Sequence, residues 1–316
     1  MSQAIPLEAI RAAAARIADS AIRTPLLRLP LEDAPAEIYL KLENLQPIGS
    51  FKLRGAGNAM ALASRGELAR GVYTASAGNM AQGVAWRAAR LGIPCHVIVP
   101  DHAPETKLAA VRRLGGEIIK VPFDLWWQVI VTGEFAGLEG LFIHPVSNAD
   151  VMAGNGTIGL EILDDMPDVD AVVIPFGGGG LSSGIASAIR ALKPDTRIYA
   201  VEVETAAPLA ASLRVGEPVT VDYRPSFVDG IGGKSVLPDI WPRVRDLLDD
   251  SLVVSLAEIW AAIRLLAERQ RVIAEGAGAA SVAAALAGKA GGGKVVCVVS
   301  GGNIEREILA GILAAD

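Results

Sequence analysis

The sequence predicts an α/β protein built from two three-layer α/β/α lobes with mostly parallel sheets. Two observations lead to this prediction. Short β-branched runs alternate along the chain with longer segments of helical apolar spacing, a pattern typical of parallel strands joined by crossover helices. The strand-like runs are continuously apolar, as expected of strands that are covered by helices on both faces. A helix layer on each side of each sheet follows.

The predicted strands are short β-branched runs bounded mainly by Gly, Pro or Asp. In chain order they are 38–42; 71–75, which begins at a glycine; 95–99, between two prolines; 117–121, between a glycine and a proline; 171–175, after an aspartate; 197–203; and 295–299, before Ser-Gly-Gly. The predicted helices repeat apolar residues at helical spacing and are 51–64, 80–91, 104–114, 156–163, 181–192, 256–271 and 277–287. Every predicted strand except the last precedes a predicted helix, which is the order that a parallel sheet requires.

The chain also divides into two parts by its glycine content. Residues 71–141 alternate strands and helices without a long glycine run, whereas glycine clusters recur from Asp150 onward. We therefore expect a small domain over 72–147 and a large domain formed by 1–71 and 148–316, with the site in the cleft between them. The chain shows no fixed-period repeat and no low-complexity linker, so the two domains should share an extensive interface.

The composition excludes several classes of function. The 316 residues include 35 acids and 29 bases that are interleaved, with a formal net charge of −6, so no basic patch is available for nucleic acid. Cys95 and Cys297 are far apart, and neither they nor the histidines have metal-ligand spacing. We expect neither a nucleic-acid partner nor a bound metal.

The sequence also predicts a cytoplasmic protein without a membrane partner. Apolar runs such as 295–299 are about five residues long, far below the roughly 20 that a membrane-spanning helix needs. Residues 1–16 place Glu8 and Arg11 among alanines and lack the basic start and unbroken apolar stretch of a signal peptide.

A run of glycines, Gly177, Gly178, Gly179 and Gly180, lies between the predicted strand 171–175 and the predicted helix 181–192. Without side chains, successive backbone N–H groups and the helix N-terminus can converge on an anion such as a phosphate. A tight turn is the alternative, but it needs only one or two glycines. The run matches neither the dinucleotide fingerprint nor the P-loop, which favours a smaller phosphorylated group.

Lys52 lies at the start of the predicted helix 51–64, in the stretch Ser-Phe-Lys-Leu-Arg-Gly. The positive end of the helix dipole, together with burial, should lower the pKa of this lysine toward the neutral amine, which is a Schiff-base nucleophile. An ordinary solvated lysine is the alternative. Combined with a phosphate site, Lys52 suggests an aldehyde cofactor that carries a phosphate, pyridoxal 5′-phosphate.

Several motifs resemble those of the serine/threonine dehydratase family, a pyridoxal-phosphate-dependent group of the tryptophan-synthase-β fold, fold type II. They occur in the family's order between Pro25 and Ala310, and they are Ser-Phe-Lys-Leu-Arg-Gly-Ala at 50–56, Ser-Ala-Gly-Asn at 76–79, Ala-Gly-Asn-Gly-Thr at 153–157, the tetraglycine, and Ser-Gly-Gly-Asn at 300–303.

The resemblance implies a role for each matching residue around the cofactor. Lys52 would bind the cofactor aldehyde and take the Cα proton, and Phe51 would pack on the pyridine ring. Asn79 would hydrogen-bond the ring hydroxyl, and Ser300 would meet the pyridine nitrogen. The tetraglycine would hold the phosphate, which makes the large domain the cofactor-binding one.

The resemblance also implies the substrate site. Ser76, Ala77, Gly78 and Asn79 would bind the substrate carboxylate. Secondary roles are expected for Glu275, near the cofactor, and for the backbone of Gly230. Related racemases carry serine where this chain has Ala77, so we expect dehydration without appreciable racemisation.

The implied activity is an ammonia-lyase reaction on a β-hydroxy amino acid of the threonine or serine type, which gives a 2-oxo acid and ammonia by β-elimination. A β-replacement enzyme of the cysteine-synthase type, and a dehydratase for an aryl or otherwise modified β-hydroxy amino acid, remain as alternatives. We also expect a homodimer.

Three departures from the family pattern bear on the substrate and on cations. Met80 stands where histidine is usual, and Asn155 where glutamine is usual. Glu202 matches the start of a cation site of the family, but Pro208 occupies a position where a carboxylate would be expected, and proline cannot coordinate a cation. Trp126 and Trp127 could pack in the small domain or form a wall for a bulky substrate.

Overall fold

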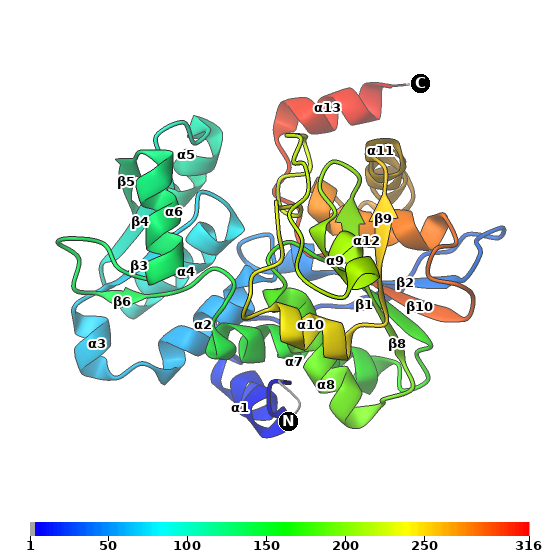
Figure 1. The fold of residues 1–316 in the computed structure, drawn as a ribbon, viewed down its shortest axis with the longest axis horizontal. Helices are drawn as coiled ribbons and strands as arrows, with labels where there is room; N and C mark the ends of the chain where they lie inside the picture. The colour runs from blue at the N-terminus through cyan, green and yellow to red at the C-terminus, as the bar shows by residue number, and fades with distance from the viewer. Residues whose placement is uncertain (1–3, 316) are drawn as a thin grey trace.

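The structure, a computed structural model, describes residues 4–315 and contains two sheets in two neighbouring lobes (Figure 1). The larger sheet has the order β1 (Leu26–Arg28), β2 (Glu37–Lys41), β10 (Lys294–Val298), β7 (Ala171–Pro175), β8 (Arg197–Val203) and β9 (Asp250–Val254). The smaller sheet has the order β5 (Glu117–Val121), β4 (Cys95–Pro100), β3 (Val72–Ala75) and β6 (Leu141–Phe142). All neighbouring strands are parallel except β1 and β2.

Helices cover both faces of each sheet. They are α1 (Leu7–Arg16), α2 (Lys52–Leu62), α3 (Arg65–Ala69), α4 (Asn79–Leu91), α5 (Glu105–Arg113), α6 (Phe123–Thr132), α7 (Ala149–Asp165), α8 (Gly180–Leu192), α9 (Pro208–Val215), α10 (Trp241–Leu247), α11 (Leu256–Leu265), α12 (Gly276–Leu286) and α13 (Arg306–Ala314). A 3-10 turn covers Glu43–Leu45, and one π-helical turn, Leu266–Gln270, extends α11.

The alternation of side chains along the strands produces the layers. In β10, Val295 and Cys297 face a core shared with α11 and α12, whereas Val296 and Val298 face a core shared with α1, α7, α8 and α10. In the smaller lobe, α4 and α5 pack on one face of the sheet and α6 on the other. The predicted fold class, two three-layer α/β/α lobes with mostly parallel sheets, is confirmed.

The chain enters the larger sheet, crosses to the smaller one, and returns. β1 and β2 come before β3 to β6, and β10 then inserts between β2 and β7. Helix α2 packs against α4 and α7, so it belongs to the boundary between the lobes. The domain limits 72–147 and 1–71 with 148–316 stay a prediction.

The largest difference from the predicted elements is α7, which begins at Ala149 rather than at residue 156. The glycines at its start disfavour a helix in isolation. In the fold they let neighbouring backbones approach: a Cβ on Gly154 would lie 2.4 Å from the Arg54 carbonyl oxygen, and one on Gly156 2.9 Å from that of Gly184. Tertiary packing therefore outweighs the local helix propensity in this segment.

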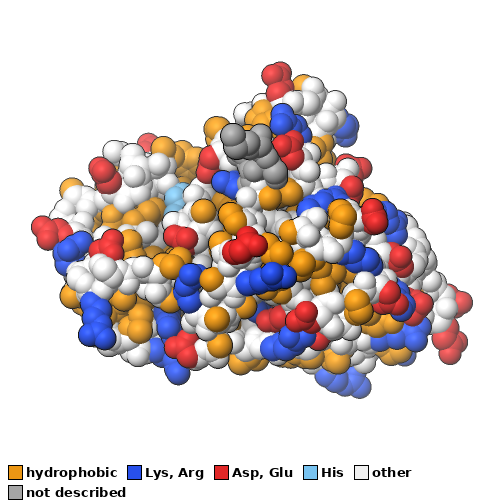
Figure 2. Space-filling model, turned by 90° about the horizontal axis from the view of Figure 1, so that it is seen from below, with side chains coloured by type: hydrophobic (Ala, Val, Ile, Leu, Met, Phe, Trp, Pro, Cys, Tyr) orange, Lys and Arg blue, Asp and Glu red, His pale blue; other side chains and the backbone are white. Residues whose placement is uncertain are grey.

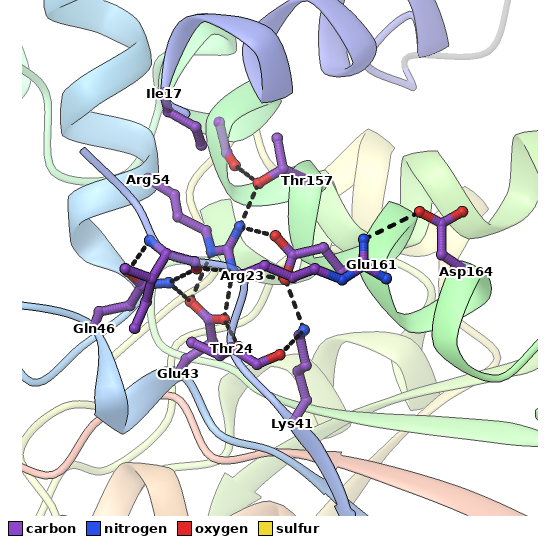
Figure 3. Close-up of polar contacts among 12 residues, drawn as sticks. Ile17, Arg23, Thr24, Lys41, Glu43, Gln46, Arg54, Thr157, Glu161 and Asp164 are labelled. Carbon is purple, nitrogen blue, oxygen red and sulfur yellow. Dashed lines mark hydrogen bonds and ion pairs between the residues drawn. The ribbon is translucent and has the colours of Figure 1, made fainter. Parts of the chain in front are cut away.

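A buried ion cluster of Lys41, Glu43, Arg54 and Glu161 ties α2 to β2 and α7 (Figure 3). Arg54 Nε lies 2.8 Å from a Glu43 oxygen, and Arg54 Nη1 lies 2.6 Å from a Glu161 oxygen. Lys41 Nζ reaches the other Glu161 oxygen at 2.6 Å. Arg54 is the third residue of α2, so this cluster anchors the turn that begins with Lys52.

The surface shows mixed charge. On the face in Figure 2, basic and acidic side chains are interspersed without a large area of one sign, which fits the interleaved charges of the sequence. Among residues 4–315, no helix is long and apolar enough to span a membrane.

Candidate active site

A cavity of about 380 Å³ lies where strands of both sheets end. Its walls include the residues that follow β3, β4, β7 and β10, which is the usual place for a site in parallel α/β sheets. The structure brings all the predicted site residues to this one cavity: Phe51, Lys52, Ser76, Ala77, Gly78, Asn79, Gly177, Gly178, Gly179, Gly180, Gly230, Glu275 and Ser300. The predicted location of the site, in the cleft between the lobes, agrees with this arrangement.

Lys52 opens α2, and its amine faces the segment that follows β6. Its Nζ donates to the Pro145 carbonyl oxygen at 2.7 Å and lies 5.2 Å from the centre of the Phe51 ring. Burial lowers the pKa of Lys52 to about 8, although the nearby Glu275 carboxylate opposes this by raising it. A substantial fraction of Lys52 is therefore the neutral amine at mildly alkaline pH.

The glycine loop, Gly177 to Gly180, connects β7 to α8. Within residues 4–315, the backbone N–H groups from Gly177 to Leu181 donate no hydrogen bond to a protein acceptor. Gly179 has φ +89°, which favours glycine, and a Cβ on Gly178 would lie 2.5 Å from the Val146 side chain. The loop thus needs its glycines and leaves a row of free donors.

A chain of polar side chains crosses the cavity wall. Asn79 Nδ2 donates to Glu275 Oε1 at 2.8 Å, and Asn303 Nδ2 donates to Asn79 Oδ1 at 2.8 Å. The Asn79 amide is therefore oriented, and its second N–H hydrogen remains available for a ligand. Burial first, and then the charge of Asp229, raise the pKa of Glu275 to about 7, although the Asn79 hydrogen bond and the charge of Lys107 oppose this by lowering it.

The Ser76–Asn79 loop is organised at the start of α4. The Ser76 hydroxyl oxygen accepts from the Gly78 N–H at 3.2 Å, so the Gly78 N–H is not free for a ligand. The N–H groups of the first turn of α4 point from the helix N-terminus, which attracts a carboxylate. Ser300, also in the cavity wall, is buried, and its carbonyl oxygen accepts from the Phe51 N–H at 3.0 Å. The backbone of Gly230 lies against Gly177.

Several cavity residues were not predicted. Asn303 lies in the Ser-Gly-Gly-Asn motif, so its identity was visible although its contact with Asn79 was not. Pro145 and Val146 carry no chemical signal in the sequence. Lys107 and Asp229 come from opposite lobes and form an ion pair at the cavity.

Of the residues that depart from the family pattern, some line the cavity and others lie outside its wall. Met80 lines the cavity and is buried. Asn155 does not line it; its Nδ2 donates to the Gly180 carbonyl oxygen at 3.4 Å, behind the glycine loop. Trp126 and Trp127 also lie outside the cavity wall.

The carboxylate of buried Glu202 accepts from the backbone N–H groups of Leu209 and Ala210, at the start of α9.

Comparison with known proteins gives the family. The family model described as pyridoxal-phosphate dependent enzyme matches residues 17–301. The chain belongs to this pyridoxal-phosphate-dependent enzyme family.

Relatives within the pyridoxal-phosphate-dependent family cover nearly the whole chain. An L-threonine ammonia-lyase of Thermotoga maritima is 41% identical over 311 residues, which are 96% of this chain and 77% of that protein. Among solved structures, maize serine racemase aligns with a TM-score of 0.89 and 33% identity, covering 98% of this chain and 96% of that one. The processed threonine deaminase isoform 2 of Solanum lycopersicum aligns with a TM-score of 0.85 and 34% identity, covering 100% and 96%.

The cavity fits the cofactor of this pyridoxal-phosphate-dependent family. The unpartnered N–H groups of the glycine loop suit a phosphate, and a side chain on Gly178 or Gly180 would collide with Val146. Lys52 supplies an amine of lowered pKa for the aldehyde, and Phe51 supplies an aromatic face beside it.

Proposed function

We propose that the protein is an ammonia-lyase that removes the β-hydroxyl and the amino group of threonine, serine or a related β-hydroxy amino acid, and releases a 2-oxo acid and ammonia. The observation that carries this proposal is the pairing of one lysine amine of lowered pKa with a row of free backbone donors in a single cavity. The relatives named threonine ammonia-lyase and threonine deaminase support it. Pyridoxal phosphate supplies an electron sink for breaking bonds at Cα.

The residues of this chain would divide the remaining work. Lys52 Nζ takes the proton from Cα, because its lowered pKa leaves part of it as a base near neutral pH. The N–H groups of the glycine loop hold the phosphate anion, and the first turn of α4 holds the substrate carboxylate. Asn79, fixed by Asn303 and Glu275, orients the ring hydroxyl. Ser300 would meet the pyridine nitrogen as a neutral hydroxyl.

A product assay tests this proposal. The enzyme is supplied with pyridoxal phosphate and given L-threonine, L-serine and aryl-substituted β-hydroxy amino acids, and 2-oxo acid and ammonia are measured. Release of both in equal amounts is the expected result. An enzyme that consumes serine only when sulfide or a thiol is present, and makes a substituted amino acid, would instead be a β-replacement enzyme.

Ala77 should make the enzyme a dehydratase without racemase activity. Alanine lines the cavity but has no proton to return to Cα. We expect D-serine to form from L-serine at least about a hundredfold more slowly than pyruvate, because a positioned general acid is worth that much. Chiral chromatography of the reaction measures both products. Ala77→Ser should raise D-serine, whereas Ala103→Ser, elsewhere in the cavity wall, should not.

Glu275 should make stability depend on pH. Burial raises its pKa from 4.5 to about 7, so the folded protein favours the protonated carboxyl, and stability falls as the pH rises from about 4.5 through 7. Glu275→Gln should remove this loss, which is on the order of 2–3 kcal/mol at pH 8. Urea unfolding of the full chain between pH 5 and 8 measures it. Glu268→Gln, at an exposed ion pair, should keep the wild-type slope.

We further propose that the enzyme works in the cytoplasm as a homodimer. Analytical ultracentrifugation of the purified protein should give twice the chain mass of 32.8 kDa; a single species at the chain mass would contradict the dimer.

A further inference from the structure

His144 lies where the chain returns from β6 to α7. Its ring nitrogen Nδ1 accepts hydrogen bonds from the backbone N–H groups of Val146 and Ser147, at 2.9 Å and 2.8 Å. An imidazole nitrogen can accept only when it carries no proton, so the ring is neutral and its proton is on Nε2. These two bonds hold residues 144–147 in a closed turn.

The turn places two groups in the site. The Pro145 carbonyl oxygen accepts from Lys52 Nζ at 2.7 Å. Val146 stands against the glycine loop, because a Cβ on Gly178 would lie 2.5 Å from its side chain and one on Gly180 would lie 2.8 Å from its carbonyl oxygen. The position of the turn therefore sets both the direction of the free lysine amine and the room behind the loop.

We propose that His144 is a positioning residue, whose neutral ring fixes the Pro145 carbonyl and Val146 and thereby holds the free amine of Lys52 opposite the glycine loop. His144 is not among the residues that line the cavity, so it acts through its neighbours. The inference rests on the proposed function in one respect, that Lys52 is the base of the reaction.

The turn should open when the ring takes up a proton, because an imidazolium has no acceptor. Burial lowers the pKa of His144, and the charge of Lys52 lowers it too, whereas the hydrogen bond with the Ile130 backbone and the charge of Asp239 raise it. The ring therefore stays neutral near pH 7. The turn should be lost only as the pH falls below the ordinary histidine value of about 6.5.

Two substitutions separate the role of the His144 ring as a hydrogen-bond acceptor from the effect of its protonation. His144→Asn keeps an acceptor oxygen that does not titrate, as Asn148 shows by accepting from the N–H groups of Asp150 and Val151. His144→Leu removes the acceptor. Since a displacement of about 1 Å can cost about a hundredfold in rate, we expect His144→Leu to lose roughly tenfold to a hundredfold in kcat with KM within about twofold. His144→Asn should stay within about threefold of wild type.

Two further measurements distinguish positioning from mere stability. The activity of the wild type should fall below about pH 6.5, and this part of the loss should be absent in His144→Asn. In the ¹⁵N spectrum of the histidine-labelled holoenzyme at pH 7.5, the ring whose signals persist in His96→Asn and vanish in His144→Asn should show an unprotonated Nδ1.

The results that would overturn the inference are equally direct. A protonated Nδ1 on His144 at pH 7.5 would contradict it, as would a His144→Leu enzyme with the kcat of wild type. If His144→Leu does not fold, two measurements still test the inference: the ¹⁵N spectrum, and the activity of His144→Asn below about pH 6.5. In a further outcome, the wild type releases no ammonia from any substrate, while Nδ1 is unprotonated and His144→Leu perturbs the visible absorption of the cofactor. That combination would contradict the proposed function and leave the positioning role of His144 standing.

Discussion

Replacing Lys52 with alanine should lower turnover by at least about a thousandfold, because one residue supplies both the covalent attachment of the cofactor and the base for the Cα proton. Lys52 lies in the cavity wall, and its amine donates to the carbonyl oxygen of Pro145. The next residue, Val146, contacts the glycine loop. Its pKa of about 8 means that the amine form grows as the pH rises through that value. In Lys52→Ala neither function has a substitute at this position.

Absorption spectroscopy separates the two losses. The wild type with pyridoxal phosphate should show the visible absorption of a covalently bound cofactor, and Lys52→Ala should show only that of the free cofactor. Lys234→Ala, a substitution of an exposed lysine outside the cavity, should keep both the band and the turnover. A Lys52→Ala enzyme that keeps the band would show that another lysine binds the cofactor, and a wild type that stays colourless would remove the cofactor from the proposal.

The glycine loop and Lys52 could be singled out because their chemistry depends on local features of the sequence, whereas the other site residues were expected only from the resemblance to the family. A run of four glycines after a strand and a lysine at the start of a helix are visible without any knowledge of the fold. Parallel strands bring their carboxyl ends to one edge, so residues more than a hundred positions apart, such as Gly177 and Ser300 after the paired strands β7 and β10, reach one cavity.

The parts that were not predictable depend on the backbone or on long-range contact. Pro145 acts through its carbonyl oxygen, which every residue has, so nothing in the sequence singles it out. The ion pair between Lys107 and Asp229 exists only because α5 and the segment before Gly230 face each other across the cavity. The spacing of apolar residues along the chain does not predict a contact between two such distant segments.

Some helices and strands were missed by the secondary-structure prediction for similar reasons. β1 and β6 are three and two residues long, too short for a pattern, and they exist because β2 and β3 offer free edges. α6 contains the apolar run Leu-Trp-Trp-Gln-Val-Ile-Val. Because Trp127 and Val131 are apolar but exposed while Val129 is buried, the apolar residues do not mark one buried face of a helix. Its ends are set instead by Pro122 and Gly133.

Replacing Arg54 with methionine should destabilise the protein by about 3–5 kcal/mol, because it leaves buried carboxylates without their partner. The Arg54 side chain is 2% exposed and that of Glu43 is 0% exposed. Burial favours the protonated form of Glu43, but the Arg54 guanidinium outweighs it and holds the pKa of Glu43 below its usual value. Glu161 would keep Lys41, at 2.6 Å, so the loss should fall mainly on Glu43.

The pH dependence and a double substitution test this assignment. Without Arg54, burial should raise the pKa of Glu43 above its usual value, so the stability of Arg54→Met should fall as the pH rises, whereas the wild-type contribution of Glu43 is lost only as the pH falls. Arg54→Met combined with Glu43→Gln should recover part of the stability at pH 8, because no charge is then left unpaired at that position. Urea unfolding from pH 5 to 8 measures both, and Arg306→Met, at a pair whose arginine side chain is 91% exposed, should leave the midpoint unchanged. Equal midpoints for Arg54→Met and wild type would show that the cluster is solvated and does not anchor α2.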